Sequence, residues 1–253
     1  MRVGYLPEER GLYKKMNVLD QLVFLGQLHG MSASEVNKRA RRWCEKLLIT
    51  EAITKRTEDL SKGMQQKIQF IAALLHNPSL VIMDEPFSGL DPVNATLLMD
   101  ALVELRGEGK TILFSTHRMD QVEKLCDHIA LIHRGHLVLS GSMREIKSSY
   151  PRNRVQINYE GDNGFLNHSS ILTVRRYPGR AEIILRPSST LADDAQSVLA
   201  SAIRSARITR FEVAEPSLED IFIEKVRETS PEQIGRELSQ AELDALKEDH
   251  VDA

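Results

Sequence analysis

Two adjacent carboxylates follow an unbroken apolar run in the first half of the sequence. The run Leu80–Met83 shows no alternation, which is typical of a parallel strand buried on both faces, and Asp84 and Glu85 come directly after it. Open α/β sheets bind their ligands at the carboxyl ends of their strands. The pair is therefore predicted to bind an ion or to polarise a water molecule.

A second apolar run ends in residues that could join this pair. Ile112–Phe114 is apolar throughout and predicts another buried parallel strand, and Ser115, Thr116 and His117 follow it. Because the carboxyl ends of parallel strands meet at one edge of a sheet, these side chains are expected beside Asp84.

A helix start upstream offers a site for an anion. Ser61 is a good N-cap residue, and the apolar positions after it are spaced three and four apart. Lys62 and Gly63 stand at this start, where free backbone N–H groups and the positive end of the helix dipole favour phosphate. Capped amphipathic helices are common, so this feature carries weight only together with the carboxylates.

Together these stretches resemble the motifs of ATP-binding cassette (ABC) ATPases. The resemblance implies ATP and Mg²⁺ as ligands and ATP hydrolysis as the activity. The motifs occur in the family's order and spacing, with Leu60–Met64 at the signature LSGGQ, Leu80–Glu85 at the Walker B motif, Ser88–Asp91 at the D-loop and His117 at the switch histidine.

The resemblance also implies roles for single residues. Asp84 would hold Mg²⁺, Glu85 would act as general base on the attacking water, and His117 would contact the γ-phosphate. In the family the signature helix caps the nucleotide of the opposite subunit, which implies a homodimer or heterodimer of ATPase domains. The residues expected at the nucleotide or the dimer seam are Ser61, Lys62, Gly63, Asp91 and Glu8.

The sequence departs from the family pattern at the signature and at the Q-loop. Lys62 replaces the second glycine of the signature and Met64 replaces its glutamine. Glu8 stands where the Q-loop has glutamine, a form that resembles the exporter branch that includes the sodium-extrusion ATPases. The alternative is that Glu8 and Glu9 are solvated loop acids.

The family's phosphate-binding loop (P-loop) is missing from these 253 residues. Gly109, Lys110 and Thr111 resemble its end, but Glu104 stands where the motif GxxxxGK[ST] needs glycine, and the segment is expected to run from helix to strand. The resemblance therefore implies an N-terminally truncated ABC ATPase. We expect negligible ATP turnover by this chain alone.

After residue 150 the pattern of apolar and polar residues changes to short alternating runs, which predicts a second domain. We expect an α/β fold in which 1–150 is a partial ABC ATPase domain with a parallel-sheet core and a helical subdomain. Short alternating runs in 151–227 predict a small C-terminal α+β accessory domain, and its ending EPSLEDIFIEKV resembles that of exporter ATPases. The acidic tail, 228–253, is expected to be a docking helix or a mobile end.

Composition and charge limit the class of protein. The 33 basic and 36 acidic residues give a formal charge of -3, which argues against a nucleic-acid binder. No apolar run approaches the roughly 18 residues that span a bilayer. We expect a cytoplasmic protein held at the inner face of the cell membrane by a transmembrane permease subunit. Cys44 and Cys126 lack metal-ligand spacing and are expected to be reduced.

Two functions from different classes remain open. The first is the nucleotide-binding subunit of an exporter, which couples ATP binding and hydrolysis to transport of sodium, drugs or peptides. The alternative is a non-catalytic docking module or decayed fragment that lends only its signature helix. A DNA-repair ABC ATPase ranks low, because the sequence has no long heptad insertion and no basic stripe.

Overall fold

A computed structural model describes residues 2–9, 11–186 and 191–229, with all side chains except those of 191, 192 and 227–229. The chain divides into two compact units, residues 1–125 and 126–253. Each unit has its own hydrophobic core, so each is described by itself.

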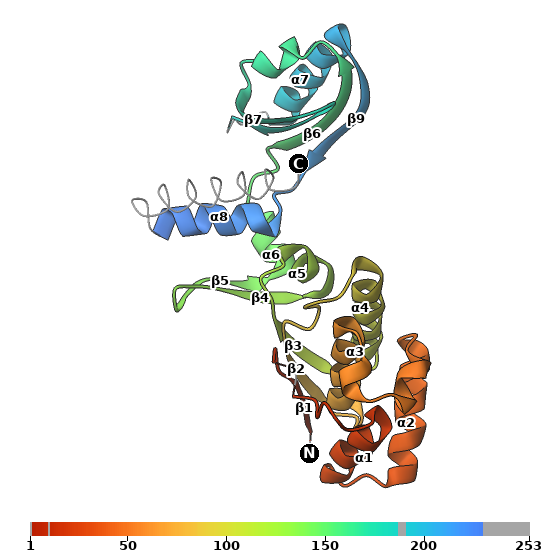
Figure 1. Cartoon of the computed structure of the whole chain (residues 1–253). Coiled ribbons are helices and arrows are strands. Elements are labelled where there is room, and N and C mark those ends of the chain that lie inside the picture. The colour runs from red at the N-terminus through yellow and green to blue at the C-terminus, as the bar shows by residue number, and fades with distance from the viewer. Residues whose placement is uncertain (1, 10, 187–190, 230–253) are drawn as a thin grey trace. The chain divides into compact units, whose positions relative to one another are not determined.

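The first unit is built on a parallel sheet of three strands (Figure 1). The order is β1 (Val3–Leu6), β2 (Leu80–Asp84) and β3 (Thr111–Ser115). Both pairings are parallel. The predicted parallel-sheet core is therefore confirmed, and β2 lies at its centre.

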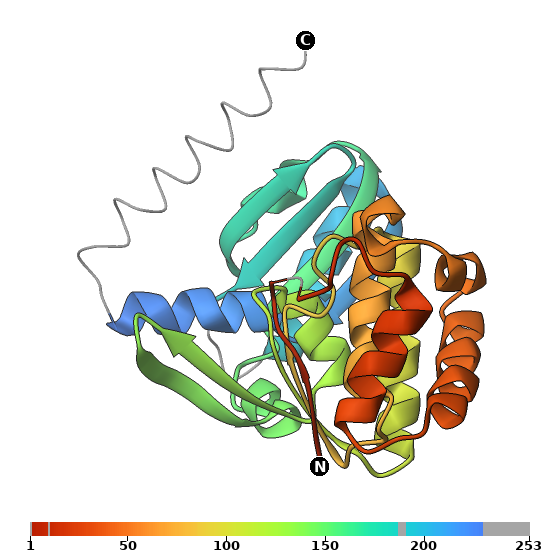
Figure 2. The same cartoon turned by 60° about the horizontal axis from the view of Figure 1, so that its bottom comes forward.

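Helices cover one face of this sheet. Helix α3 contacts β1 and α4 contacts β3, while α1 and α2 pack on each other and on α3 (Figures 1 and 2). The bounds are α1 Val18–Leu28, α2 Ala33–Lys46, α3 Lys62–Leu74, α4 Pro92–Gly107 and α5 Met119–Leu125, with short 3₁₀ turns at Thr50–Thr54 and Thr57–Asp59.

The opposite face of the sheet is not buried as the sequence predicted. Tyr5, Ile82 and Leu113 lie side by side across the three strands, and Tyr5 and Leu113 are each 60% exposed. The prediction that Ile112–Phe114 is buried on both faces is therefore wrong. Strand β3 lies at an edge of the sheet and alternates between half-buried and exposed residues.

Two glycines allow backbones to approach closely in this unit. A Cβ on Gly4 would lie 2.3 Å from the carbonyl oxygen of Ala73, and one on Gly26 would lie 2.3 Å from Cγ2 of Val36. Any larger residue would push α3 away from β1 or α1 away from α2. Gly4 therefore allows α3 to lie close against the sheet, and Gly26 allows α1 to lie close against α2.

The second unit begins with a β-hairpin. Strands β4 (His128–His133) and β5 (His136–Ser142) are antiparallel, and α6 (Met143–Ser148) follows them. Arg134 and Gly135 form the turn with φ values of 50° and 79°. Positive φ at both central residues is the geometry of a tight hairpin turn. Helix α8 (Leu218–Thr229) contacts β5.

The rest of this unit is a four-stranded antiparallel sheet in the order β7-β8-β6-β9. Helix α7 (Leu191–Ser205) packs against it, and Val198 and Ala202 are buried in the shared core. The predicted α+β fold is confirmed, whereas its boundaries stay predictions, and the predicted tail lies outside the described residues from 230 onward. The remaining bounds are β6 Arg154–Gly161, β7 Ile171–Tyr177, β8 Arg180–Leu185 and β9 Ala206–Ala214, with a 3₁₀ turn at Gly164–Asn167.

Within the described ranges, no helix combines the length and the apolar character needed to cross a bilayer. Cys44 is buried and Cys126 is half-buried, and no disulfide joins them.

Candidate functional site

The strand register brings the predicted residues to one edge of the first sheet. Leu6 pairs with Met83, and Asp84 pairs with Ser115, so all three strands end at the same level. The hydroxyl of Ser115 donates a hydrogen bond to Oδ1 of Asp84 at 2.5 Å. Asp84 therefore lies at a carboxyl edge, where parallel sheets bind ligands.

Glu85 has an unusual backbone conformation at this edge. Its φ of 43° lies in the left-handed region, which costs a non-glycine residue about 1–2 kcal/mol. The Glu85 amide donates to the carbonyl of Ser115 at 2.9 Å, which extends the β2–β3 pairing by one residue. The Glu85 side chain reaches Thr116 and His117, which follow the neighbouring strand β3.

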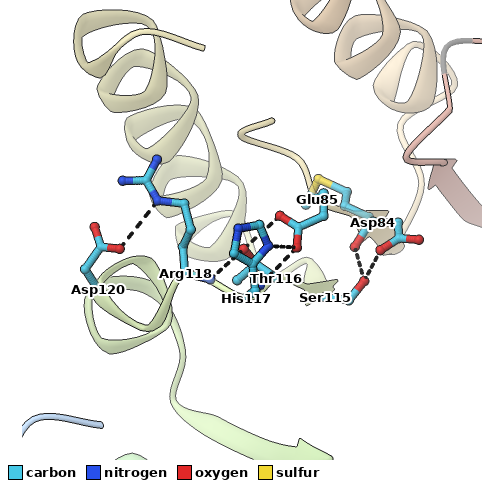
Figure 3. A network of polar contacts seen from close by, with 8 residues as sticks. Asp84, Glu85, Ser115, Thr116, His117, Arg118 and Asp120 are labelled. Carbon is cyan, nitrogen blue, oxygen red and sulfur yellow. Dashed lines mark hydrogen bonds and ion pairs between the residues drawn. The ribbon is translucent and has the colours of Figure 1, made fainter. Parts of the chain in front are cut away.

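The carboxylate of Glu85 is held by groups that follow β3 (Figure 3). Its Oε2 accepts from the hydroxyl of Thr116 at 3.0 Å, and its Oε1 accepts from the backbone amide of His117 at 2.9 Å. Nδ1 of His117 lies 2.7 Å from the same Oε1. The side chain of Glu85 is 16% exposed, whereas that of His117 is 84% exposed. An oriented carboxylate thus lies beside an imidazole that solvent can reach.

Ser61 and Asp91 are both N-cap residues. Oγ of Ser61 accepts from the amide of Met64 at 3.2 Å, and the Asp91 carboxylate accepts from the amide of Asn94 at 2.9 Å. The hydrogen bonds that Asp91 accepts, first from the backbone amide of Asn94 and then from the side chain of Asn94, lower the pKa of Asp91 below its ordinary value. Lys62 stands exposed at the first position of α3.

Gly63 connects the two caps in space. A Cβ at this position would lie 3.4 Å from Cδ2 of Leu90 and 3.7 Å from the carbonyl oxygen of Gly89. The start of α3 therefore lies against the segment before Asp91. Among the described residues, no hydrogen bond joins this surface to the cluster of Glu85 and His117.

Glu8 is exposed in the bend that follows β1. The strand register places it at the same sheet edge as Asp84, but its side chain makes no hydrogen bond or ion pair with any described residue. The structure thus brings Asp84, Glu85 and His117 together and leaves the Glu8 side chain apart from them.

Two residues that the sequence did not single out also bear on this edge. The buried side chains of Gln66 and Gln69 donate to backbone carbonyls of the segments that carry Glu85 and Glu8. A signal was present, because these two amides lie in the same helix as the buried Ile68 and Phe70. Polar groups at core positions need specific partners.

The resemblance implies Mg²⁺ as a ligand at this edge of the sheet. No three His, Cys, Asp or Glu side chains converge as a metal cage in the described part of the chain. Mg²⁺ is commonly bound through one or two carboxylates together with water and substrate phosphates. Asp84, with a hydroxyl beside it at the strand end, fits that kind of site.

Comparisons with known proteins show which family the chain belongs to. The chain is 48% identical over 224 residues, 88% of its length and 83% of the relative's, to the uncharacterized ABC transporter ATP-binding protein BpOF4_11395 of Alkalihalophilus pseudofirmus. The chain belongs to the family of ABC transporter ATP-binding proteins. Another member, YhaQ of Bacillus subtilis, is 46% identical over 226 residues, which are 89% of this chain and 74% of YhaQ.

Family models and solved structures agree with this ABC assignment. Residues 141–226 match the model "ATP-binding protein DrrA1-3-like, C-terminal domain", and 55–119 match "AAA domain, putative AbiEii toxin, Type IV TA system". A solved "ATP binding subunit of ABC transporter" is 30% identical with a TM-score of 0.54, and the alignment covers 58% of this chain and 62% of that one. The ABC protein NatA of Bacillus subtilis is 34% identical over 149 residues, 58% of this chain and 61% of NatA.

Proposed function

We propose that this ABC protein is the nucleotide-binding subunit of an exporter, which couples ATP binding and hydrolysis to transport through a membrane partner. The observation that carries the proposal is the Glu85 carboxylate, oriented at a sheet edge by Thr116 and His117. The family relationship supports ATP as the ligand.

In this proposal Glu85 is the general base for the attacking water. The Glu85 carboxylate accepts hydrogen bonds from the Thr116 hydroxyl and the His117 amide. These bonds reduce the rotamer freedom of Glu85 before substrate binds. The exposed His117 ring can leave Oε1 and donate to the γ-phosphate, which frees that oxygen to accept a proton from water. Asp84 and Ser115 would hold Mg²⁺, which supplies charge neutralisation for phosphoryl transfer.

The exposed start of α3 would act on a second subunit. No hydrogen bond joins Ser61, Lys62 or Gly63 to Glu85 in the described structure. In this proposal they cap a nucleotide held by another copy or a paralogue. Gly63 beside Leu90 would place Asp91 at the same dimer seam. Free N–H groups and a lysine at a helix start favour phosphate.

The α1–α2 layer is the proposed surface for the permease, at the inner face of the membrane. Tyr13 and Phe24 are 57% and 40% exposed, and their rings meet edge to face at 6.2 Å. Lys14, Lys15 and Met16 complete the lining of an open cavity of about 590 Å³. Aromatic rings beside two lysines suit a cytoplasmic permease segment that carries apolar and acidic residues.

The alternative is a docking module that does not hydrolyse ATP. Residues 1–253 by themselves do not contain GxxxxGK[ST]. In line with this, we expect negligible phosphate release from purified 1–253 alone, and robust turnover by that polypeptide would overturn this expectation.

The Glu85→Gln variant separates the two functions. The tagged protein is purified from membranes with whatever permease accompanies it, and phosphate release is measured. Loss of a general base is expected to lower turnover roughly 100-fold or more while ATP binding is retained. Glu108→Gln, at an exposed acid just after α4, is the matched control. A complex whose phosphate release and transport survive Glu85→Gln would support the docking module instead.

A further inference from the structure

Two amide side chains of helix α3 lie at buried positions, which apolar residues usually occupy. Gln66 is 2% exposed and Gln69 is 5% exposed, in the same helix as the fully buried Ile68 and Ile71. A buried amide without partners costs about 1–3 kcal/mol, so these two side chains require specific acceptors. Their acceptors are backbone carbonyls in two different loops.

Gln66 binds the segment directly after Glu85. Its Nε2 donates to the carbonyl oxygen of Pro86 at 3.0 Å, and the bond is buried. A backbone in the left-handed region persists only where its surroundings hold it. The Gln66 bond fixes the carbonyl next to the strained Glu85 residue, so it contributes to the direction of the Glu85 side chain.

Gln69 binds the segment that contains Glu8. Its Nε2 donates to the carbonyl of Glu9 at 2.9 Å and lies 3.5 Å from the carbonyl of Pro7. Its Oε1 is buried and has no hydrogen-bond partner among the described residues. The amide therefore serves as a donor only, and its target is the backbone on both sides of Glu8.

We propose that Gln66 and Gln69 are positioning residues, through which α3 sets the backbone of both acidic segments at once. They are three positions apart and so lie on one face of the helix. The same helix begins at Ser61 and touches Leu90. Engagement of this helix start in a dimer is thereby transmitted to Glu85 and Glu8. The role of these bonds in ATP hydrolysis rests on the proposed function, whereas their hold on the two loops does not.

The chain offers an internal control for this inference. Gln65, on the same helix, donates to the carbonyls of Thr57 at 3.0 Å and Leu60 at 3.1 Å, away from both acidic segments. We call the hydrogen bonds from each of these glutamines to one loop a tether. One tether is removed at nearly constant side-chain volume by each of the variants Gln65→Met, Gln66→Met and Gln69→Met. Amide hydrogen exchange read by mass spectrometry then reports each loop separately.

We expect a different loop to respond in each variant of the full chain. Gln66→Met should speed exchange about fivefold in a peptide covering 84–91 and leave 3–9 unchanged. Gln69→Met should do the reverse, and Gln65→Met should change only 56–61. Equal exchange in all three loops, or a uniform rise in all of them, would overturn the tethers. Gln66→Leu, which also has no donor, replaces Gln66→Met if that variant does not fold.

A second measurement tests whether the tether positions Glu85. In the permease complex, Gln66→Met should lower kcat about tenfold with KM for ATP unchanged, whereas Glu108→Gln, at the exposed acid just after α4, should change neither. An unchanged kcat in Gln66→Met would overturn the positioning role. The exchange experiment needs no ATP turnover, so failure of the tethers is distinguishable from failure of the proposed function.

Discussion

Nδ1 of His117 lies 2.7 Å from Oε1 of Glu85, although 32 positions separate the two residues in the sequence. The contact exists because β2 and β3 are neighbouring parallel strands that end at the same level. The Thr116 hydroxyl reaches the other oxygen of the same carboxylate. The side chains of Thr116 and His117 differ in solvent exposure, and each can be removed by its own substitution.

Thr116→Val and His117→Ala should therefore have different effects. Thr116→Val removes a half-buried bond to Glu85 and is expected to destabilise the chain by about 1 kcal/mol. His117 is 84% exposed, so its removal should change stability by less than about 0.5 kcal/mol while lowering phosphate release from the complex strongly. Urea unfolding and phosphate release measure the two effects. A large loss of stability in His117→Ala, with turnover intact, would contradict this assignment.

Two substitutions at Ser61 separate helix capping from phosphate binding. Ser61→Ala should cost about 1 kcal/mol of stability, because the Met64 amide loses its cap. Asp caps as well as Ser, so Ser61→Asp should retain stability. Its negative charge should nevertheless abolish ATP-dependent association of two subunits, measured by light scattering. If Ser61→Asp still associates with ATP, Ser61 does not face phosphate.

His76 should make the first unit less stable in mild acid. Burial lowers the pKa of His76 below its usual 6.5, and the ring stacks on His29 with centroids 3.9 Å apart. The unfolded chain then binds more protons between the folded pKa and 6.5. The stability from neutral His76 is complete above 6.5 and declines as pH falls toward the folded pKa.

His76→Gln should flatten this pH dependence, since an amide can still donate to the Val3 carbonyl that Nε2 of His76 contacts at 3.0 Å. Urea unfolding between pH 5.5 and 7.5 can be followed by the fluorescence of Trp43, the single tryptophan of the chain. His136→Gln, in the exposed hairpin, is the control. Identical slopes for wild type and His76→Gln would show that His76 does not titrate differently on folding.

Cys44 should resist alkylation in the folded protein. Burial raises its pKa from 9.0 to about 11. At pH 8 only about 0.1% is then thiolate, the reactive form. Iodoacetamide should label the half-buried Cys126 first and both cysteines equally in urea, as judged by peptide mass spectrometry. Native labelling of Cys44 at the rate of Cys126 would contradict the buried position.

Local features of this chain were predictable from the sequence because they depend on near neighbours. The caps of Ser61 and Asp91 each satisfy an amide three positions away, and the cap at Ser61 forms as expected. The turn at Arg134 and Gly135 is likewise local. Burial of Ile112–Phe114 was mispredicted, because an apolar run shows only that a strand can be buried and not what covers each face.

The sequence by itself determined the family, the order of the elements and the residue types that meet at the sheet edge. It placed Asp84, Glu85 and His117 at strand ends, because apolar runs mark strands and parallel strands end together. Only the tertiary structure decided which atoms touch. The register joins Glu85 to His117, and the packing of α3 on β1 brings Gln66 and Gln69 to the loops that they hold. Such contacts depend on distances between elements, which local patterns do not encode.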